Sequence, residues 1–306
     1  MTAGEAVLAE VRPAAFAVAY RMLGSVAEAE DVVQEALLRL HRTLEAGEQI
    51  ASPRAYVATV TTRLAIDQLR SARARRETYV GEWLPEPLVD DDPARHAEVA
   101  DSLSLAFLVL LETLSPEQRA AFLLREVFDY DYDRIAEIVG TSDANARQLA
   151  ARARKHVDAG RPRFDASREQ RDALADRFFA AVGDGDLDAL EALLAEDVVI
   201  AGDGGGKAPA LARAMFGKAR VLRLFGAWVR LMPRIGAFSV RRVDVNGQPG
   251  GVLQTGDRVI GVMALEIADG QIQGIKSVVN PEKIAHVGPP ADVFGLLRGG
   301  RSENQS

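Results

Sequence analysis

The 306-residue sequence contains no cysteine and only four histidines. The absence of cysteine excludes disulfides, thiolate zinc sites and thiol redox switches. The histidines His41, His96, His156 and His286 are widely scattered along the chain, as is usual for surface histidines. We therefore expect no metal site and no cofactor.

Long hydrophobic runs are missing as well. The longest, such as residues 105–111 and 260–265, are far shorter than the ~20 residues that a transmembrane helix needs. Residues 1–16 also lack the basic start and the apolar block of a secretory signal. We expect a cytoplasmic protein that does not bind membranes.

The sequence also lacks an excess of positive charge: its formal net charge is −7. DNA-binding proteins gain affinity by neutralising phosphates, so this sum alone would argue against a nucleic-acid partner. The charges are segregated, however. Basic residues cluster at 63–76 and 147–163, whereas acidic residues cluster at 82–98 and 184–203. Nucleic-acid binding by the basic segments therefore remains open.

The chain is long enough for two or three domains. Apolar residues recur at helical spacing over residues 6–23, 27–44 and 53–76, and again from residue 102 to about 157. Prolines and acidic residues fill the stretch between these helical regions. The predicted boundaries are 1–78 for a first helical domain, 79–101 for a linker, 102–160 for a second helical domain, 161–170 for a connector, 171–292 for an α+β domain and 293–306 for a tail.

The α+β domain is predicted to place helices first and strands after them. Helical spacing covers residues 171–195 and 211–231, on either side of the glycine-rich DGGGK segment at 203–207. Four β-rich stretches follow, and Asp269-Gly270 is a strong hairpin signal. These stretches are residues 238–245, 251–254, 258–267 and 271–279. We expect a curved, mostly antiparallel sheet wrapped around a helix.

Residues 132–157 have the layout of a helix-turn-helix. A short helix, YDRIAEIV, precedes Gly140 and the capping residue Ser142, and a second helix, ANARQLAARARKHV, follows. The second helix has a small apolar side and a polar side that could enter a major groove. The alternative is an amphipathic surface helix with a solvated basic side. The DNA-binding candidates here are Asn145, Arg147, Gln148, Arg152 and Lys155.

Residues 53–76 form a second basic helix, with an apolar ridge and an opposite arginine-rich side. A basic helix end is often only solvated, but two basic elements on separate helical domains favour a bipartite DNA reader. The candidates on this helix are Arg54, Tyr56, Arg63, Arg70, Arg73, Arg75 and Arg76.

Three stretches together resemble the extracytoplasmic-function (ECF) RNA polymerase sigma factors. They are AEDVVQEALLRL, SPRAYVATVTTRLAIDQLRSARARRE and the block from Leu114 to Val157. The resemblance implies two all-α sigma domains, the second with the helix-turn-helix, and core RNA polymerase and promoter DNA as partners. It implies that residues 43–51 and 56–76 read and open the −10 element, and that residues 142–155 read the −35 element. Core-polymerase contacts would fall on Asp31, Gln34, Glu35 and Arg39.

Arg63 departs from the pattern, because many members of the family carry Asn there. A phosphate contact is then the alternative to the usual polar contact.

YVGEWLPEPL, DGGGK and NPEKIAHV resemble the sigma-factor group with a SnoaL-like C-terminal extension. The resemblance implies a cone-shaped α+β fold that regulates the sigma domains in cis. DGGGK lacks the spacing of a nucleotide P-loop, and we see no convincing strand before it. A flexible turn that lets the backbone and Lys207 approach another domain is the favoured interpretation over a phosphate site.

We hypothesise an apolar clip between the linker and the extension, because a Trp and a Leu in an acidic, proline-rich linker need a surface to bury against. Its candidate residues are Trp83, Leu84, Pro85, Pro87, Asp203, Lys207, Asn280, Pro281 and Lys283. A second hypothesis is that Asp90, Asp91 and Asp92 compete with nucleic acid for positive surfaces, with a solvated linker as the alternative.

Two rival functions stay open. One is a one-component helix-turn-helix regulator with a ligand-binding domain, which would not need the AEDVVQE helix. The other is a SnoaL-like enzyme, for which Asp257 and Glu266 are the available carboxylates in the strand region. We expect no enzyme, a monomer when free, and a cone in which a small ligand of unknown chemistry is conceivable.

Overall fold

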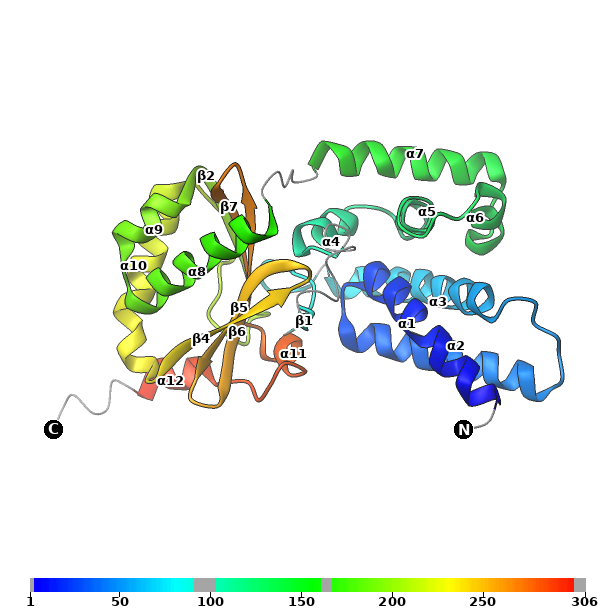
Figure 1. Ribbon diagram of the computed structural model, residues 1–306, viewed down its shortest axis with the longest axis horizontal. Coiled ribbons are helices and arrows are strands. Elements are labelled where there is room, and N and C mark those ends of the chain that lie inside the picture. The colour runs from blue at the N-terminus through cyan, green and yellow to red at the C-terminus, as the bar shows by residue number, and fades with distance from the viewer. Residues whose placement is uncertain (1–2, 77, 91–102, 161–166, 300–306) are drawn as a thin grey trace. The chain divides into compact units, whose positions relative to one another are not determined.

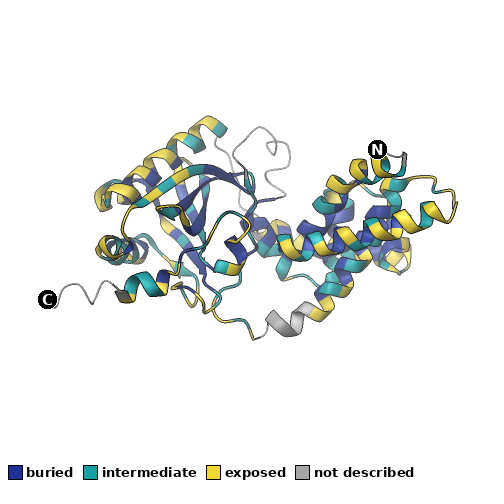
Figure 2. Cartoon of the chain, turned by 90° about the horizontal axis from the view of Figure 1, so that it is seen from below, coloured by how far each residue is buried: buried dark blue, intermediate teal, exposed yellow. Residues whose placement is uncertain are grey.

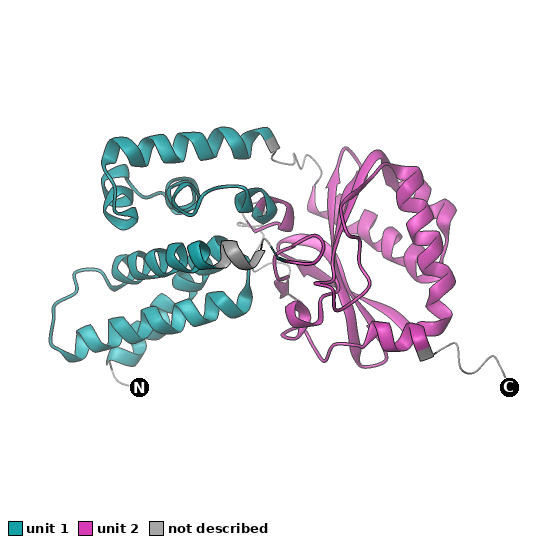
Figure 3. Ribbon diagram, turned by 180° about the vertical axis from the view of Figure 1, so that it is seen from behind, with its two compact units in different colours: residues 1–78, 108–161 teal, residues 79–107, 162–306 magenta. Residues whose placement is uncertain are grey.

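The computed structural model describes residues 3–76, 78–90, 103–160 and 167–299. The chain forms two compact units, and Figure 3 colours them separately. Unit 1 combines residues 1–78 with residues 108–161, and unit 2 combines residues 79–107 with residues 162–306. The linker between the two helical regions therefore belongs to the same unit as the C-terminal domain.

Three helices form the first part of unit 1: α1 (Ala3–Leu23), α2 (Val26–Glu45) and α3 (Pro53–Arg76). Their contact buries Tyr20, Leu23 and Leu40 completely. Gly24 ends α1 with φ 65°, and the Ser25 side chain accepts a hydrogen bond from the Glu28 amide to cap α2. These local signals are those the sequence predicts for a stop and a cap.

The second part of unit 1 contains α5 (Pro116–Glu126), α6 (Tyr132–Val139), α7 (Asp143–Gly160) and the end of α4 (Leu105–Glu112). Ser115 and Gln118 form a capping box at the start of α5. Gly140 ends α6 in the left-handed conformation, with φ 77°. Figure 1 shows α6 and α7 joined at this short turn.

Unit 2 is built on a seven-stranded mixed sheet in the order β1-β4-β5-β6-β7-β2-β3. All neighbouring strands are antiparallel except β2 and β7, which are parallel. The expected α+β cone with a mostly antiparallel sheet is confirmed. The strands are β1 (Val89–Asp90), β2 (Leu194–Asp203), β3 (Met215–Phe216), β4 (Phe238–Val245), β5 (Gln248–Thr255), β6 (Arg258–Ala268) and β7 (Gln271–Val278).

Helices α8 (Arg168–Asp184), α9 (Leu187–Leu193) and α10 (Lys218–Ile235) lie together at the sheet, as Figure 1 shows. Phe178 of α8 and Phe225 of α10 meet edge to face, 5.8 Å apart, in the core over the sheet. Two short helices follow the last strand: α11 (Pro281–Ile284) and α12 (Val293–Gly299). Figure 2 shows buried residues along the strands of unit 2 and exposed residues on the outer sides of its helices.

Two sequence expectations about unit 2 are wrong. Residues 171–195 are not helical throughout, because β2 begins at Leu194 and runs directly into DGGGK at Asp203. The helix expected at 211–231 is preceded by β3 and begins only at Lys218. Strand β2 escapes detection because a register shift between Leu194 and Val199 breaks its alternation of buried and exposed residues.

Candidate nucleic-acid interface and linker site

The helix-turn-helix presents one continuous polar face on α7. Asn145, Gln148, Arg152 and Lys155 are all exposed, and at 100° per residue they fall within roughly 80° of the helix circumference. Ala146, Ala150, Ala153 and Val157 are buried on the opposite side. The small inner residues let α7 lie close to α5 and α6 and leave the polar face outward.

Two of the predicted α7 residues also make contacts within the motif. The Asn145 amide donates a hydrogen bond to the Thr141 hydroxyl at 2.7 Å. Arg147 pairs with Asp143 at 3.0 Å and lies over the Tyr132 ring. Arg147 is therefore set to the side of the face that carries Gln148 and Arg152.

Helix α3 carries the other DNA-binding candidates, and some of them form hydrogen bonds or ion pairs inside unit 1. Arg54 is exposed, and the Tyr56 hydroxyl lies 3.1 Å from that of Thr43. Arg70 forms an ion pair with Glu117 of α5 at 2.8 Å. The side chains of Arg73, Arg75 and Arg76 lie outside the described part of the structure.

Arg63 is the residue that most directly joins the two helical parts of unit 1. Its guanidinium donates to the carbonyl of Glu137 at 2.8 Å and to that of Ile138 at 3.1 Å. These carbonyls belong to the last turn of α6, where backbone oxygens lack helical partners and attract cations. Arg134 adds a bond from α6 to the Thr59 hydroxyl of α3 at 2.9 Å.

A buried arginine that the sequence analysis missed supports the same packing. Arg119 of α5 donates to the Arg21 carbonyl of α1 at 3.2 Å and pairs with Glu112 at 2.5 Å. Burial lowers the pKa of Arg119 to about 9, so the guanidinium still carries its charge at neutral pH. The sequence gives no sign that this residue is buried, because arginines in proteins are mostly exposed.

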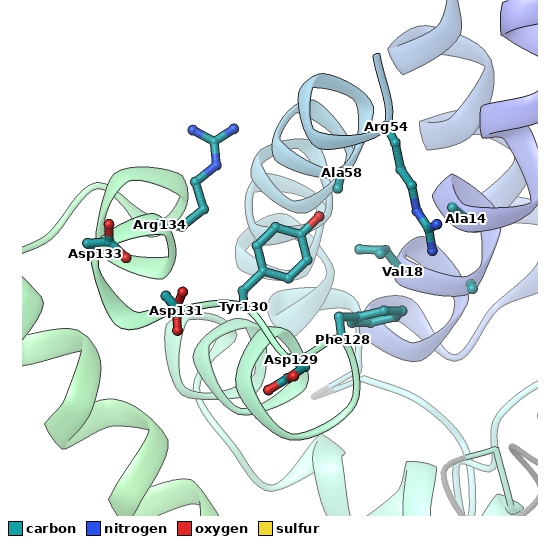
Figure 4. A pocket seen from close by; sticks show the side chains of 11 residues that line it. Ala14, Val18, Arg54, Ala58, Phe128, Asp129, Tyr130, Asp131, Asp133 and Arg134 are labelled. Carbon is teal, nitrogen blue, oxygen red and sulfur yellow. The ribbon is translucent and has the colours of Figure 1, made fainter. Parts of the chain in front are cut away.

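A cleft of about 560 Å³ lies between α1, α3 and the segment from Phe128 to Arg134. Figure 4 shows Tyr130 at its centre, Arg54 on the α3 side, and Asp129, Asp131 and Asp133 on the facing segment. Arg125 lies 3.6 Å from Asp129 and 3.7 Å from Asp131. The cleft thus has a basic residue on one side and an acidic loop on the other.

The outer side of α2 carries the predicted core-polymerase contacts. Asp31, Gln34 and Arg39 are exposed, Glu35 is half-buried, and Arg39 pairs with Glu35 at 2.7 Å. Leu38 is exposed on the same side, with 41% of its surface accessible. A single exposed leucine is common on protein surfaces, so Leu38 does not by itself identify a binding surface.

In unit 2, the linker adds a strand to the sheet and buries its apolar side chains. Strand β1 pairs with β4 and becomes the edge strand of the sheet, an addition that the linker prediction missed. Leu84, Pro85 and Pro87 are buried, and Trp83 is half-buried. The Leu88 amide and carbonyl also bond to Asn246, and the Asn246 side chain donates to the Leu103 carbonyl.

Asp203 is the centre of the linker contact. Its fully buried carboxylate accepts hydrogen bonds from the Tyr79 hydroxyl at 2.5 Å, the Leu84 amide at 2.8 Å and the Lys283 ammonium at 2.7 Å. Lys283 also donates to the Leu84 carbonyl and lies 4.1 Å from the centre of the Trp83 ring. One carboxylate and one ammonium therefore hold the linker in a buried setting, where charge-assisted bonds are strong.

Tyr79 extends this network to the NPEK segment. The Asn280 amide donates to the Tyr79 hydroxyl at 2.8 Å, while the Asn280 oxygen accepts from the Glu282 amide and caps α11 behind Pro281. Burial, and then the hydrogen bond to Asp203, raise the pKa of Tyr79 above its usual range. Tyr79 was not among the predicted site residues, although it stands directly before the tryptophan segment.

Glycine is required in DGGGK because the network lies against the backbone. Gly205 has φ 55°, and a Cβ atom there would lie 2.4 Å from the Asn280 amide nitrogen and 2.9 Å from the Tyr79 hydroxyl. Lys207 pairs with Glu282 of NPEK and is half exposed. Lys207 thus contacts the neighbouring motif, and its side chain forms no ion pair or hydrogen bond with the described part of the linker.

Other linker residues differ in what they contact. His286 lies 2.8 Å from the Pro87 carbonyl, which the scattered histidines gave no reason to expect. The Glu82 carboxylate accepts from the Ala214 amide at 3.1 Å. Asp91 and Asp92 lie outside the described residues, as does the side chain of Asp90.

The interior of unit 2 contains an apolar cavity of about 280 Å³. Its wall includes Phe225, Trp228, Leu253 and Met263, and it carries no acidic or basic side chain among the described residues. Asp257 is exposed in a turn, and Glu266 pairs with Lys276 at 3.4 Å. Neither carboxylate lines the cavity, so neither candidate for acid/base chemistry is placed there.

The described residues contain no group of three or more His, Cys, Asp or Glu side chains placed to hold a metal ion. None of their helices has both the length and the apolar character to span a bilayer.

Family models match three segments of the chain: Sigma-70 region 2 at residues 7–75, Sigma-70 region 4 at residues 104–157 and a SnoaL-like domain at residues 175–275. ECF RNA polymerase sigma factor SigJ of Mycobacterium tuberculosis is 40% identical over 280 residues, which cover 87% of this chain and 88% of SigJ. The probable ECF sigma factor SigI of the same organism is 32% identical over 270 residues, covering 87% and 89%.

The crystal structure of M. tuberculosis SigJ superposes with a TM-score of 0.72 at 37% identity, covering 90% of this chain and 96% of that one. The similarity thus spans both sigma regions and the C-terminal domain. The chain belongs to the ECF RNA polymerase sigma factors and carries a SnoaL-like domain after its two sigma regions.

Proposed function

We propose that this ECF sigma factor is controlled in cis by its SnoaL-like domain, which holds the linker between the two sigma regions. The observation that carries the proposal is the burial of Leu84 and its bonds to Asp203 and Lys283. A free linker would let the sigma regions separate on core polymerase. A held linker restricts that movement.

Promoter reading is assigned to the two basic helices. Gln148, Arg152 and Lys155 on the outer face of α7 would enter the major groove of the −35 element. Arg54 and Tyr56 at the start of α3 would contact the −10 element, together with Arg73, Arg75 and Arg76 farther along the chain. Arg63 and Arg70 bond to Ile138 and Glu117 in unit 1, and these bonds would compete with their contacts to phosphates.

Core polymerase would bind the outer side of α2. Asp31, Gln34 and Arg39 supply polar contacts, and exposed Leu38 supplies an apolar anchor. This helix face is what separates a sigma factor from a one-component regulator. We infer that the protein acts in the cytoplasm, where core polymerase is found, and that it is a monomer when free.

The SnoaL-like domain would act as a regulator without covalent chemistry. Its cavity is apolar and lacks an acid/base pair among the described residues, so a small apolar ligand suits it better than a reactive substrate. The cavity wall includes Gly202, next to Asp203. A ligand there could therefore alter the linker contact.

Run-off transcription with core polymerase tests the proposal. The full chain is compared with a chain that ends near Arg168 and with full-length Trp83→Ala, which removes the ring over Lys283. We expect initiation by the full chain and altered output from both variants. No initiation by either the full or the shortened chain would contradict the sigma-factor function, while unchanged output from Trp83→Ala would contradict control through the linker.

A further inference from the structure

The SnoaL-like domain contains a long segment of one charge sign that the linker site does not use. Between Asp203 and Asp244 the sequence has no acidic residue, in a chain whose formal net charge is −7. The segment carries two lysines and seven arginines: Lys207, Arg213, Lys218, Arg220, Arg223, Arg230, Arg234, Arg241 and Arg242. Helix α10 forms the middle of this segment.

Four of these arginines lie on one side of α10. Arg220, Arg223, Arg230 and Arg234 are all exposed, and their spacing of three, seven and four residues keeps them within roughly 80° of the helix circumference. The buried residues Val221 and Phe225 point to the core. At ~1.5 Å per residue the row is about 21 Å long.

The four arginines also lack ion-pair partners among the described residues. Lys218, at the start of the helix, pairs with Glu196 at 2.6 Å. No ion pair or hydrogen bond to a described residue is seen for the side chains of Arg220, Arg223, Arg230 or Arg234. The row is therefore a positive surface whose side chains form no direct ion pair with the described residues, although the neighbouring helix α9 carries the exposed acidic residues Asp188 and Glu191. Figure 1 shows α10 at the outside of unit 2.

The composition of this surface indicates which anion it suits. Arginine offers a planar fork that matches phosphate oxygens. On this side only Ala227 lies between the arginines, and no exposed large apolar residue lies on α10. A protein interface would need apolar anchors, and a single strand would need aromatic stacking. Closely spaced duplex phosphates need only the charges.

We propose that the arginine row of α10, residues Arg220, Arg223, Arg230 and Arg234, binds the phosphate backbone of duplex DNA. The SnoaL-like domain then adds a sequence-independent DNA contact to those of the sigma regions. This contact would be independent of the linker site, since none of the four arginines takes part in the bonds around Asp203.

The test measures binding of the full chain to a 25-base-pair duplex without promoter elements, over a series of salt concentrations. Arg223→Gln/Arg230→Gln removes two charges from the row, and Arg177→Gln/Arg241→Gln removes two exposed charges from α8 and β4 in unit 2. Each phosphate contact adds about 0.9 to the slope of log K against log salt. When salt rises from 50 to 200 mM, the affinity of the unmodified chain should therefore fall by a factor about 12 times larger than the affinity of the row variant.

The control variant should keep the slope of the unmodified chain, and Arg223→Lys/Arg230→Lys should keep most of it because the charge remains. Circular dichroism shows whether each variant is folded. An unchanged slope for the folded glutamine variant would overturn the proposal. So would a variant that binds DNA normally but loses affinity for core polymerase, because the row would then bind an acidic protein surface.

Discussion

Asp203→Asn is the sharpest perturbation of the linker contact, because it removes one charge and almost no volume. The Asp203 carboxylate is fully buried, and the side chain of its partner Lys283 is 8% exposed. Removing one member of a buried ion pair leaves an uncompensated charge and costs ~3–5 kcal/mol. One carboxylate oxygen accepts from both Leu84 and Lys283, and an asparagine oxygen in its place can still accept both bonds. We therefore expect the lower value, about 3 kcal/mol.

The tryptophans make this loss measurable at the linker itself. The chain has only two, so in a Trp228→Phe background Trp83 is the sole emitter. Asp203→Asn should increase acrylamide quenching of Trp83 and lower the melting temperature of the C-terminal unit by about 6–12 °C. Asp257→Asn, which changes an exposed turn, should change neither quantity.

A second substitution tests whether the loss of stability comes from the unpaired charge of Lys283. Adding Lys283→Met to Asp203→Asn removes the unpaired ammonium, so the double variant should recover part of the lost stability. The reasoning fails if Asp203→Asn melts within 1 °C of the unmodified chain and keeps Trp83 protected. It also fails if Lys283→Met makes the asparagine variant less stable still.

Three further predictions concern other contacts. Folding raises the pKa of Tyr79. The contribution of Tyr79 to stability is therefore complete below its unfolded pKa of ~10, and it is lost as pH rises from there through the folded pKa. Quenching of Trp83 should stay constant from pH 7 to 9 and increase above pH 10, and Tyr79→Phe should abolish this pH dependence. Gly205→Ala should release the linker, because its Cβ meets Asn280. Gly256→Ala is the matched control, with φ 58° but no atom within 4 Å, and equal effects of the two would contradict the contact. Glu117→Gln should cost under ~1 kcal/mol of stability and raise DNA affinity by freeing Arg70, as filter binding would show. Asp67→Asn, which leaves the bond to α5 in place, should raise the affinity less.

Local signals in the sequence were sufficient for much of the fold. Ser25, Ser52 and Ser115 accept the hydrogen bonds of helix caps, and Gly140 ends the first helix of the helix-turn-helix. Strands β4, β6 and β7 begin where their β-rich stretches begin. These features depend on residues within a few positions of one another, so periodicity and capping are enough to find them.

The contacts among the predicted clip residues could not be predicted from the sequence. Resemblance pointed to Leu84, Asp203 and Lys283, but nothing in the sequence orders them around one buried carboxylate. Tyr79, His286 and strand β1 were missed because their partners lie more than a hundred residues away. Arg63 was predicted to face solvent or phosphate, and its bonds to the end of α6 depend on how two helical regions pack.

The sequence by itself thus determined the helices, the hairpins, the basic faces and the family, because each is written in residue types at fixed spacing. Only the tertiary structure decided which charges meet. The fold surrounds Asp203 with Tyr79, Leu84 and Lys283, and it leaves the arginines of α10 without a described partner. The physical reason is that burial and pairing of charges depend on distances between segments that share no local pattern.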